Sequence, residues 1–311
     1  MKTVADAVFA APEVAPEASA RASVARSLRR HRSMVTGGAL LSVIVAIAVL
    51  APLLGTMNPA QIDPAARNRR PGAEGALRSA DGTRTMVTYW MGTDSLGRDV
   101  YSRVIYGARV SLVVGVAVAS ISAALGLVIG VLAGYLRWLD SIVMRVMDGL
   151  MSIPAILLAI GLVSLSRAGL RTVILAIVIP EVPRVVRLVR AVVLSIREEP
   201  YVEAAVALGA RTPMLLARHV LPNTVAPLIV QATFVCASAI LVEAILSFLG
   251  VGIPPETPTW GNIMAEGRAL FRIFPHNILF PGVFLAATVL AVNMLGDGLR
   301  DMLDPRIGTR L

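Results

Sequence analysis

Long uncharged, apolar stretches alternate with short charged segments along this chain of 311 residues. An α-helix rises about 1.5 Å per residue, so roughly 20 apolar residues are needed to cross a hydrocarbon layer of about 30 Å. Stretches of that kind predict an all-α membrane protein with six transmembrane helices. The expected spans are 34–56, 110–136, 145–166, a segment that begins at 172, 219–242 and 273–296.

The fourth of these spans has the weakest apolar pattern. Only nine uncharged residues, 172–180, precede Glu181, and Arg184 follows three residues later. Glu181 and Arg184 would share a helical face, where they can pair and offset part of the cost of burial. Arg187 and Arg190 continue the same spacing, so we expect this helix to extend out of the membrane into the cytoplasm.

Charged residues around the first span predict how the chain is oriented in the membrane and how it divides into segments. A basic cluster at 26–32 precedes the first apolar run, and positive charge favours the cytoplasmic side. We therefore expect a disordered cytoplasmic tail over 1–33, a first transmembrane helix over 34–56 and an external segment over 57–109. A core domain over 110–311 would hold the other five spans and return the C-terminus to the cytoplasm.

Composition supports a membrane location and narrows the choice of partners. Apolar residues make up 56% of the chain and charged residues only 16%, which is far from the balance of a soluble domain. The net charge of +9 comes almost wholly from arginine, because Lys2 is the only lysine. Such charge favours contact with anionic lipid headgroups over binding to nucleic acid. A lone cysteine, Cys236, excludes a disulfide within the chain.

Residues that carry catalysis do not occur in recognisable arrangements. A phosphate-binding loop needs a lysine after its glycines, and Lys2 cannot serve, so the chain is not expected to bind ATP itself. His31, His219 and His276 are widely separated, which argues against a metal site. There is no G-x-S-x-G nucleophile elbow. We expect no catalytic residue, no metal and no cofactor bound by this chain.

Three carboxylates near the apolar runs, Glu181, Glu243 and Asp297, allow two interpretations. A proton-coupled transporter would use them as relays, whereas a structural role would pair them with arginine or place them at helix ends. Because they are few and no histidine accompanies them, we favour the structural role. The energy source is then expected to lie in another protein.

Small residues recur along the second apolar run. Gly126, Gly130 and Gly134 are four residues apart, so they lie on one face of a helix. In lipid, helices associate through close packing rather than through exclusion of water. We therefore predict a helix–helix contact along these three glycines.

The segment 198–223 predicts two short helices that project from the membrane. Pro200 suits the first turn of a helix, and Gly209 suits the position after its end. Pro213 resembles the start of a second short helix, which we expect to end near Pro222. An exposed apolar ridge on the first helix would fit a groove on another protein. That ridge consists of Ala204, Ala205 and Val206.

The same segment carries a family resemblance. Glu203-Ala204-Ala205, then Gly209, then His-x-Leu-Pro at 219–222, resemble the EAA loop of ATP-binding-cassette importer permeases. Within that superfamily, YVEAA followed by RHVLPN is similar to the dipeptide, oligopeptide and nickel branch. The segment 92–112 resembles the sequence that leads into the second span of the C-type permease, and 246–264 and 296–306 are further matches.

The resemblance implies roles for named residues. Coupling to ATPase subunits falls on Glu203, Ala204, Ala205, Gly209, His219, Leu221 and Pro222. A structural role at the external entrance to the second span falls on Gly92, Asp94, Gly97, Arg98 and Asp99. The chain also departs from the family pattern, because Val182 stands where a tryptophan is expected, which leaves the path of the fourth span open.

The resemblance further implies a type I importer fold that works in a complex. Its partners would be a second, non-identical permease, two cytoplasmic ATPase subunits that use ATP and Mg, and an extracytoplasmic substrate-binding protein. The two permeases would form a path for di- or oligopeptides across a bacterial cell membrane. Nickel or another small solute is an alternative cargo, and an ATP-independent secondary transporter or a purely structural membrane subunit are less favoured alternatives.

Overall fold

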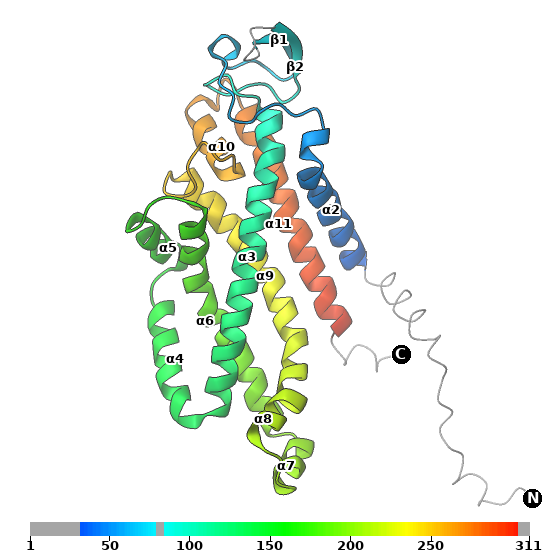
Figure 1. Ribbon diagram of the computed structural model, residues 1–311, viewed down its shortest axis with the longest axis vertical. Helices are drawn as coiled ribbons and strands as arrows, with labels where there is room; N and C mark the ends of the chain where they lie inside the picture. Colours follow the sequence, from blue (N-terminus) through cyan, green and yellow to red (C-terminus); the bar gives the residue numbers. More distant parts are fainter. Residues whose placement is uncertain (1–31, 79–83, 304–311) are drawn as a thin grey trace, which may run out of the picture.

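The computed structural model describes residues 32–78 and 84–303. Long helices run side by side along the molecule, a β-hairpin covers one end, and short helices lie at the other (Figure 1). We refer to these as the hairpin end and the α7 end. The tail expected over 1–33 lies, apart from its last two residues, outside the described part of the chain.

The described chain is mainly helical. Its α-helices are α2 (Arg32–Val49), α3 (Val100–Tyr135), α4 (Arg137–Met151), α5 (Ala155–Ser164), α6 (Leu170–Arg197), α7 (Pro200–Ala207), α8 (Thr212–Leu215), α9 (Leu221–Phe248), α10 (Trp260–Gly267) and α11 (His276–Leu303). Short 3-10 turns occupy Ala51–Leu53, Pro64–Ala66 and Arg268–Leu270, and Leu216–Val220 is a π-helical turn. Strands β1 (Ala73–Arg78) and β2 (Arg84–Tyr89) pair antiparallel, with Ala73 opposite Tyr89, so the fold is not strictly all-α.

Four helices are long and apolar enough to cross a membrane: α2, α3, the combined helix Thr212–Phe248 and α11. α4 and α5 would supply a fifth span if they count as one. α6 has 28 residues, but Glu181 and several arginines interrupt its apolar character. A mainly helical membrane protein is therefore confirmed, whereas the number of six spans stays a prediction.

The third span, predicted over 145–166, is not one continuous helix. α4 already begins at Arg137, before the predicted start of this span, and α5 turns away from it by 84° after a short break. Pro154 explains the break, because it lacks an N–H and disfavours helical geometry at the residue before it. The segment is therefore two helices at nearly a right angle.

α3 extends ten residues further toward the hairpin end than the apolar run at 110–136 indicated. Its first residue is Val100, and the side chain of Asp99 accepts a hydrogen bond from the backbone N–H of Ser102 at 2.8 Å. This is an N-cap, which satisfies one of the free N–H groups at the start of a helix. Charged residues in the first turns of α3 hid its beginning from the apolar pattern.

The most extensive helix contact joins α3 to α6. A Cβ atom added to Gly130 would stand 2.7 Å from the Cβ of Val189, and one added to Gly134 would stand 2.8 Å from the Cβ of Val193. Gly126 meets Val185 in the same way, at 2.5 Å. The glycines thus let the valines of α6 approach the backbone of α3, as expected for packing in lipid. We refer to this contact as the glycine seam.

Replacement of Gly130 by alanine is expected to destabilise the protein, because the new methyl group collides with Val189. Overpacking costs about 1–3 kcal/mol, which outweighs the gain of up to about 1 kcal/mol in helix propensity. The melting temperature of the purified protein in detergent should fall. Gly161→Ala in α5 is the matched control, because nothing lies within 4 Å of its added Cβ, and its melting temperature should stay the same or rise. Equal melting temperatures for both variants would contradict the close packing inferred at the glycine seam.

Candidate functional site

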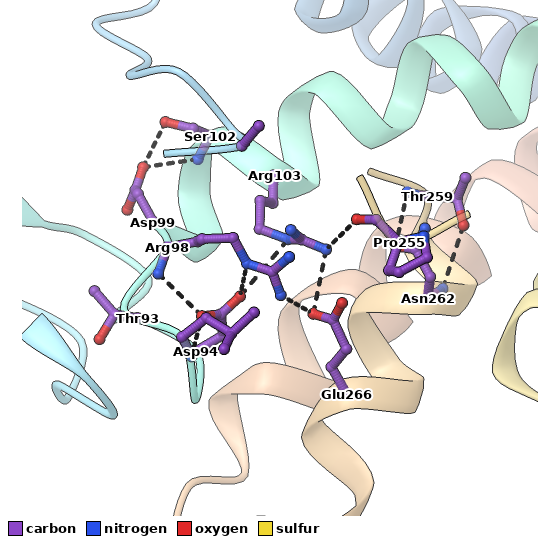
Figure 2. Close-up of polar contacts among 12 residues, drawn as sticks. Thr93, Asp94, Arg98, Asp99, Ser102, Arg103, Pro255, Thr259, Asn262 and Glu266 are labelled. Atoms are coloured by element: carbon purple, nitrogen blue, oxygen red, sulfur yellow. Dashed lines mark hydrogen bonds and ion pairs between the residues drawn. The ribbon is translucent and has the colours of Figure 1, made fainter. Parts of the chain in front are cut away.

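A buried cluster of ion pairs ties the start of α3 to α10 at the hairpin end (Figure 2). The Nε atom of Arg98 lies 2.7 Å from Oδ2 of Asp94, and its Nη2 donates to Glu266. Arg103, whose side chain is fully buried, lies with Nη2 3.2 Å from the same carboxylate oxygen of Glu266. Two guanidinium groups of one segment therefore converge on a carboxylate from a helix more than 160 residues later.

The loop before α3 is shaped by its own side chains. Oδ1 of Asp94 accepts hydrogen bonds from the backbone N–H groups of Leu96 and Arg98, each at 2.9 Å. Gly92 and Gly97 have φ angles of 78° and 80°, which favour glycine, and an added Cβ at Gly97 would stand 1.8 Å from the carbonyl oxygen of Asp63. The structure thus brings the five predicted residues of this segment into one compact turn.

Two members of this cluster, Arg103 and Glu266, were not singled out by the sequence. Arg103 lies within the segment 92–112 and Glu266 two residues after the segment 246–264, so the family resemblance of these segments is the signal that could have drawn attention to them. Burial raises the pKa of the Glu266 carboxyl, against the opposing effect of Arg103 and Arg98. Burial likewise raises the pKa of Asp99, against hydrogen bonds from Ser102. The donors Arg103, Arg98 and Ser102 therefore offset only part of the effect of burial on these two carboxyls.

Trp260 anchors α10 beneath this cluster. Its side chain is fully buried, and its indole Nε1 donates to the carbonyl oxygen of Val104 at 3.0 Å. Thr259 and Asn262 form a capping box at the start of the helix. The segment between the spans predicted at 219–242 and 273–296 therefore contains a helix, because its cap residues satisfy the first turn.

At the opposite end, α7 projects beyond the long helices (Figure 1). Val202 is buried and fixes α7 to the core, whereas Glu203 and Ala204 are exposed and Ala205 is partly exposed. Gly209 has a φ of 81°, and its N–H donates to the carbonyl oxygen of Val206 at 2.9 Å. The helix therefore ends on a left-handed glycine, as the sequence predicted.

The second short helix of this segment does not end at Pro222, and that prediction was wrong. α8 continues through the π-helical turn directly into α9, and Pro222 lies in the first turn of α9. Proline is tolerated there because the first N–H groups of a helix have no partner within it. The ring of His219 in the π-helical turn lies 5.7 Å from the ring of Tyr201 in α7. The two parts of the EAA-like motif therefore meet in space, with Leu221 partly buried next to them.

Arginines line the half of α6 nearest the α7 end. Arg190 binds Asp140 of α4, with Nη2 2.7 Å from Oδ2, and Arg187 binds Asp148 of the same helix. Arg197 donates to the carbonyl oxygen of Gly134 at 2.9 Å and so closes the last turn of α3. These contacts hold α3, α4 and α6 together in the part of the molecule nearest the α7 end.

The expected pair of Glu181 and Arg184 is confirmed. Nη1 of Arg184 lies 3.0 Å and 3.2 Å from the two carboxylate oxygens of the buried Glu181. The hydroxyl of Ser238 in α9 donates to the same carboxylate at 2.9 Å. α6 is one continuous helix through Val182, with Pro180 and Pro183 inside it, so its path is regular where the sequence left it open.

Glu243 is fully buried between α3 and α9. It accepts hydrogen bonds from the hydroxyls of Ser247 at 2.8 Å and Ser111 at 3.3 Å. No arginine or lysine lies within ion-pair distance of it among the described residues. Its partners therefore are hydroxyl groups, which agrees with a structural role in part but not with the expected pairing to arginine. Asp297 in α11 is exposed.

Two family models match this chain. Residues 126–309 match the model described as binding-protein-dependent transport system inner membrane component. Residues 19–71 match the model described as the N-terminal TM domain of oligopeptide transport permease C. The first match alone spans more than half of the sequence.

Several relatives match over nearly their whole length. The chain is 53% identical over 284 residues to the probable peptide ABC transporter permease protein y4tQ of Sinorhizobium fredii, which covers 91% of this chain and 92% of the relative. It is 46% identical to a putative peptide transport system permease protein of Brucella abortus, with 91% of each chain covered. It is 38% identical to a dipeptide transport system permease protein of Alkalihalophilus pseudofirmus, with 91% and 88% covered.

Removal of the Glu266 carboxylate is expected to destabilise the hairpin end. Glu266→Ala leaves Arg103 without its closest carboxylate. The free energy of unfolding should fall by about 3 kcal/mol, which is the low end for a broken buried ion pair. The low end applies because the Glu266 side chain is 22% exposed and Asp94 still binds Arg98. A clear fall in the melting temperature would show this. Glu256→Ala is the control, because Glu256 is exposed in the preceding loop and forms no ion pair with any described residue. A Glu266 variant as stable as the control would contradict the role of the cluster.

Proposed function

Because this chain belongs to the family of inner membrane components of binding-protein-dependent transport systems, we propose that it is the C-type permease subunit of an ATP-driven peptide importer. The names of the three relatives described above give peptide or dipeptide as their cargo. In this proposal the chain catalyses no reaction. It forms the translocation path with a second, non-identical permease, and an extracytoplasmic binding protein delivers the peptide.

We place the α7 end in the cytoplasm and the hairpin end outside. The basic cluster at 26–32 supports this orientation, since positive charge next to a first span favours the cytoplasmic side. In a bacterial cell membrane, α2, α3, the pair α4 and α5, α6, α9 and α11 would then make six crossings. Both ends of the chain would lie in the cytoplasm.

The observation that carries the coupling proposal is the exposed surface of α7. Leu208 is 89% exposed and Val206 is 56% exposed, although both are apolar. Met214, just beyond α7, is 52% exposed as well. Apolar side chains gathered at a projecting helix suit a groove on another protein. We assign that groove to two cytoplasmic ATPase subunits, which bind the ATP and Mg that this chain is not expected to bind.

Coupling would proceed through rigid connections. ATP binding closes the two ATPases and draws α7 with them. Val202 fixes α7 to the core, Arg197 joins the end of α6 to α3, and the glycine seam continues this link along both helices. Movement of α7 would therefore tilt α6 and α3 together and change the side on which the path is open.

Co-purification through a tag on this chain tests the assembly. Recovery of a second permease and two ATPases from the native membrane, with ATP hydrolysis stimulated by peptide-loaded binding protein, is the expected result. Transport of nickel or another small solute by the same complex would change the cargo but keep the architecture. Recovery of this chain alone, with transport driven by an ion gradient, would overturn the proposal.

Glu203→Ala is expected to lower stimulated ATP hydrolysis and transport by about tenfold, the effect of about 1.4 kcal/mol at a protein contact. Glu203 is exposed on α7, so its loss should leave the melting temperature of this subunit unchanged. Glu198→Ala is the control, because Glu198 is also exposed but precedes α7. Unchanged coupling in Glu203→Ala would show that α7 does not carry the contact.

A further inference from the structure

Arg184 differs from the other arginines in its half of α6. Arg187 and Arg190 bind carboxylates of α4, and Arg197 binds carbonyl oxygens of α3. Arg184 uses a single nitrogen, Nη1, to bind Glu181. Its Nε and Nη2 atoms form no hydrogen bond with any described residue, and 46% of its side chain is exposed. A guanidinium with free donors thus projects from the surface of this subunit.

On the proposed assignment of α6 as a membrane crossing, Arg184 does not face lipid. It lies halfway along the 28 residues of α6, or about 21 Å from the start of that helix. It is also one residue from Val185, which packs against Gly126 in an apolar stretch of α3. A charged side chain at such a depth faces protein or a water-filled space, because exposure to hydrocarbon is too costly.

A hollow begins one helical turn from Arg184. Its volume is about 410 Å³, within the range of sites for small ligands, and it lies between α6, α9 and α11. Leu188 of α6, Gln231 and Phe234 of α9 and Arg300 of α11 contribute to its walls. We refer to the surface formed by Arg184 and these residues as the α6–α9 face. Two guanidinium groups and one amide stand along an otherwise apolar wall.

We propose that the α6–α9 face lines the translocation path and that Arg184 binds the terminal carboxylate of the passing peptide. This inference rests on the proposed function. A guanidinium donates two parallel hydrogen bonds to a carboxylate, and Nε and Nη2 of Arg184 are the free pair for this contact. Gln231 and Arg300 supply further donors along the hollow.

Glu181 makes the contact weak enough for transport. Its carboxylate neutralises part of the charge of Arg184, and Ser238 holds Glu181 in place. A site in a path has to bind its cargo favourably yet release it. A fully unpaired arginine would hold a carboxylate more tightly, so the buried glutamate sets the strength of the site.

Transport of two peptides by the reconstituted complex tests the carboxylate contact. Trialanine carries a free carboxylate and trialanine amide does not, and each is supplied on saturating binding protein whose loading is measured separately. In Arg184→Gln, the ratio of trialanine transport to amide transport should fall about tenfold, the size expected for loss of a charge-assisted contact. Arg184→Lys keeps the charge and should restore part of the ratio.

Arg187→Gln is the matched control, because it removes the same charge one turn away, where the partner is Asp148 of α4. Its ratio should equal that of the wild-type complex. Since the binding protein is the same in every arm, a change of ratio belongs to the permease. An unchanged ratio in Arg184→Gln would overturn the carboxylate contact, whereas a wild-type complex that transports neither peptide would instead overturn peptide import.

Thiol labelling tests the path without reference to the cargo. In a Cys236→Ser background, Arg184→Cys and Gln231→Cys should react with a charged methanethiosulfonate reagent in the assembled complex in nanodiscs. Val128→Cys should not react, because Val128 is 58% exposed on α3 but lies in an uncharged stretch close in depth to the Gly126 contact. Absence of labelling at Arg184→Cys in every nucleotide state would show that the second permease covers it, and would overturn the proposal.

Discussion

α3 and α6 approach so closely along Gly126, Gly130 and Gly134 that valines of α6 occupy the places where side chains of α3 would stand. Lipid provides no hydrophobic force between helices, so this contact depends on dispersion over a close, matched surface. The two features that look functional lie at the ends of these helices. The ion cluster is built on the loop before α3 and on its first turn, and α7 follows directly after α6.

The charged side chains have different partners at the two ends of the molecule and between them. At the hairpin end, Arg98 and Arg103 are buried and share a carboxylate from α10. At the other end, Arg187 and Arg190 form half-exposed pairs with α4. Between these levels, Glu243 is satisfied by hydroxyls alone, and Arg184 keeps donors free. Since a buried ion pair gives little net stability, these pairs serve chiefly to fix geometry.

The geometry that they fix separates a rigid part from an adaptable one. The loop before α3 is held by Asp94, by two glycines with positive φ and by the ion pairs, so it has little freedom. α7 is held mainly by Val202 and by the ring contact of Tyr201 with His219. A helix with one anchored face and one exposed apolar face can move with a partner while staying attached to α6.

The sequence by itself determined the features that depend on residues close together in the chain and on the preference of apolar residues for lipid. The apolar runs located the long helices, the glycine spacing located the seam, and Gly209 marked the end of α7. These features follow from helix periodicity and from backbone angles that one residue type favours. The motif residues Gly92 to Asp99 were recognised only through the family resemblance, and the structure shows that Asp94 shapes their turn locally.

Tertiary structure alone decided which distant groups meet. No local pattern could tell that Glu266 would reach Arg98 and Arg103, that α5 would bend by 84° from α4, or that α8 would continue into α9. A local rule gave Pro222 the wrong role, because proline ends one helix as readily as it begins another. Packing also determines which face of α6 is exposed. The glycine seam covers one side of this helix and α4 covers another, so Arg184 lies on a side that neither of them covers. Sequence fixes the donors and acceptors that each helix carries, but only the packing of helices determines which of them remain free.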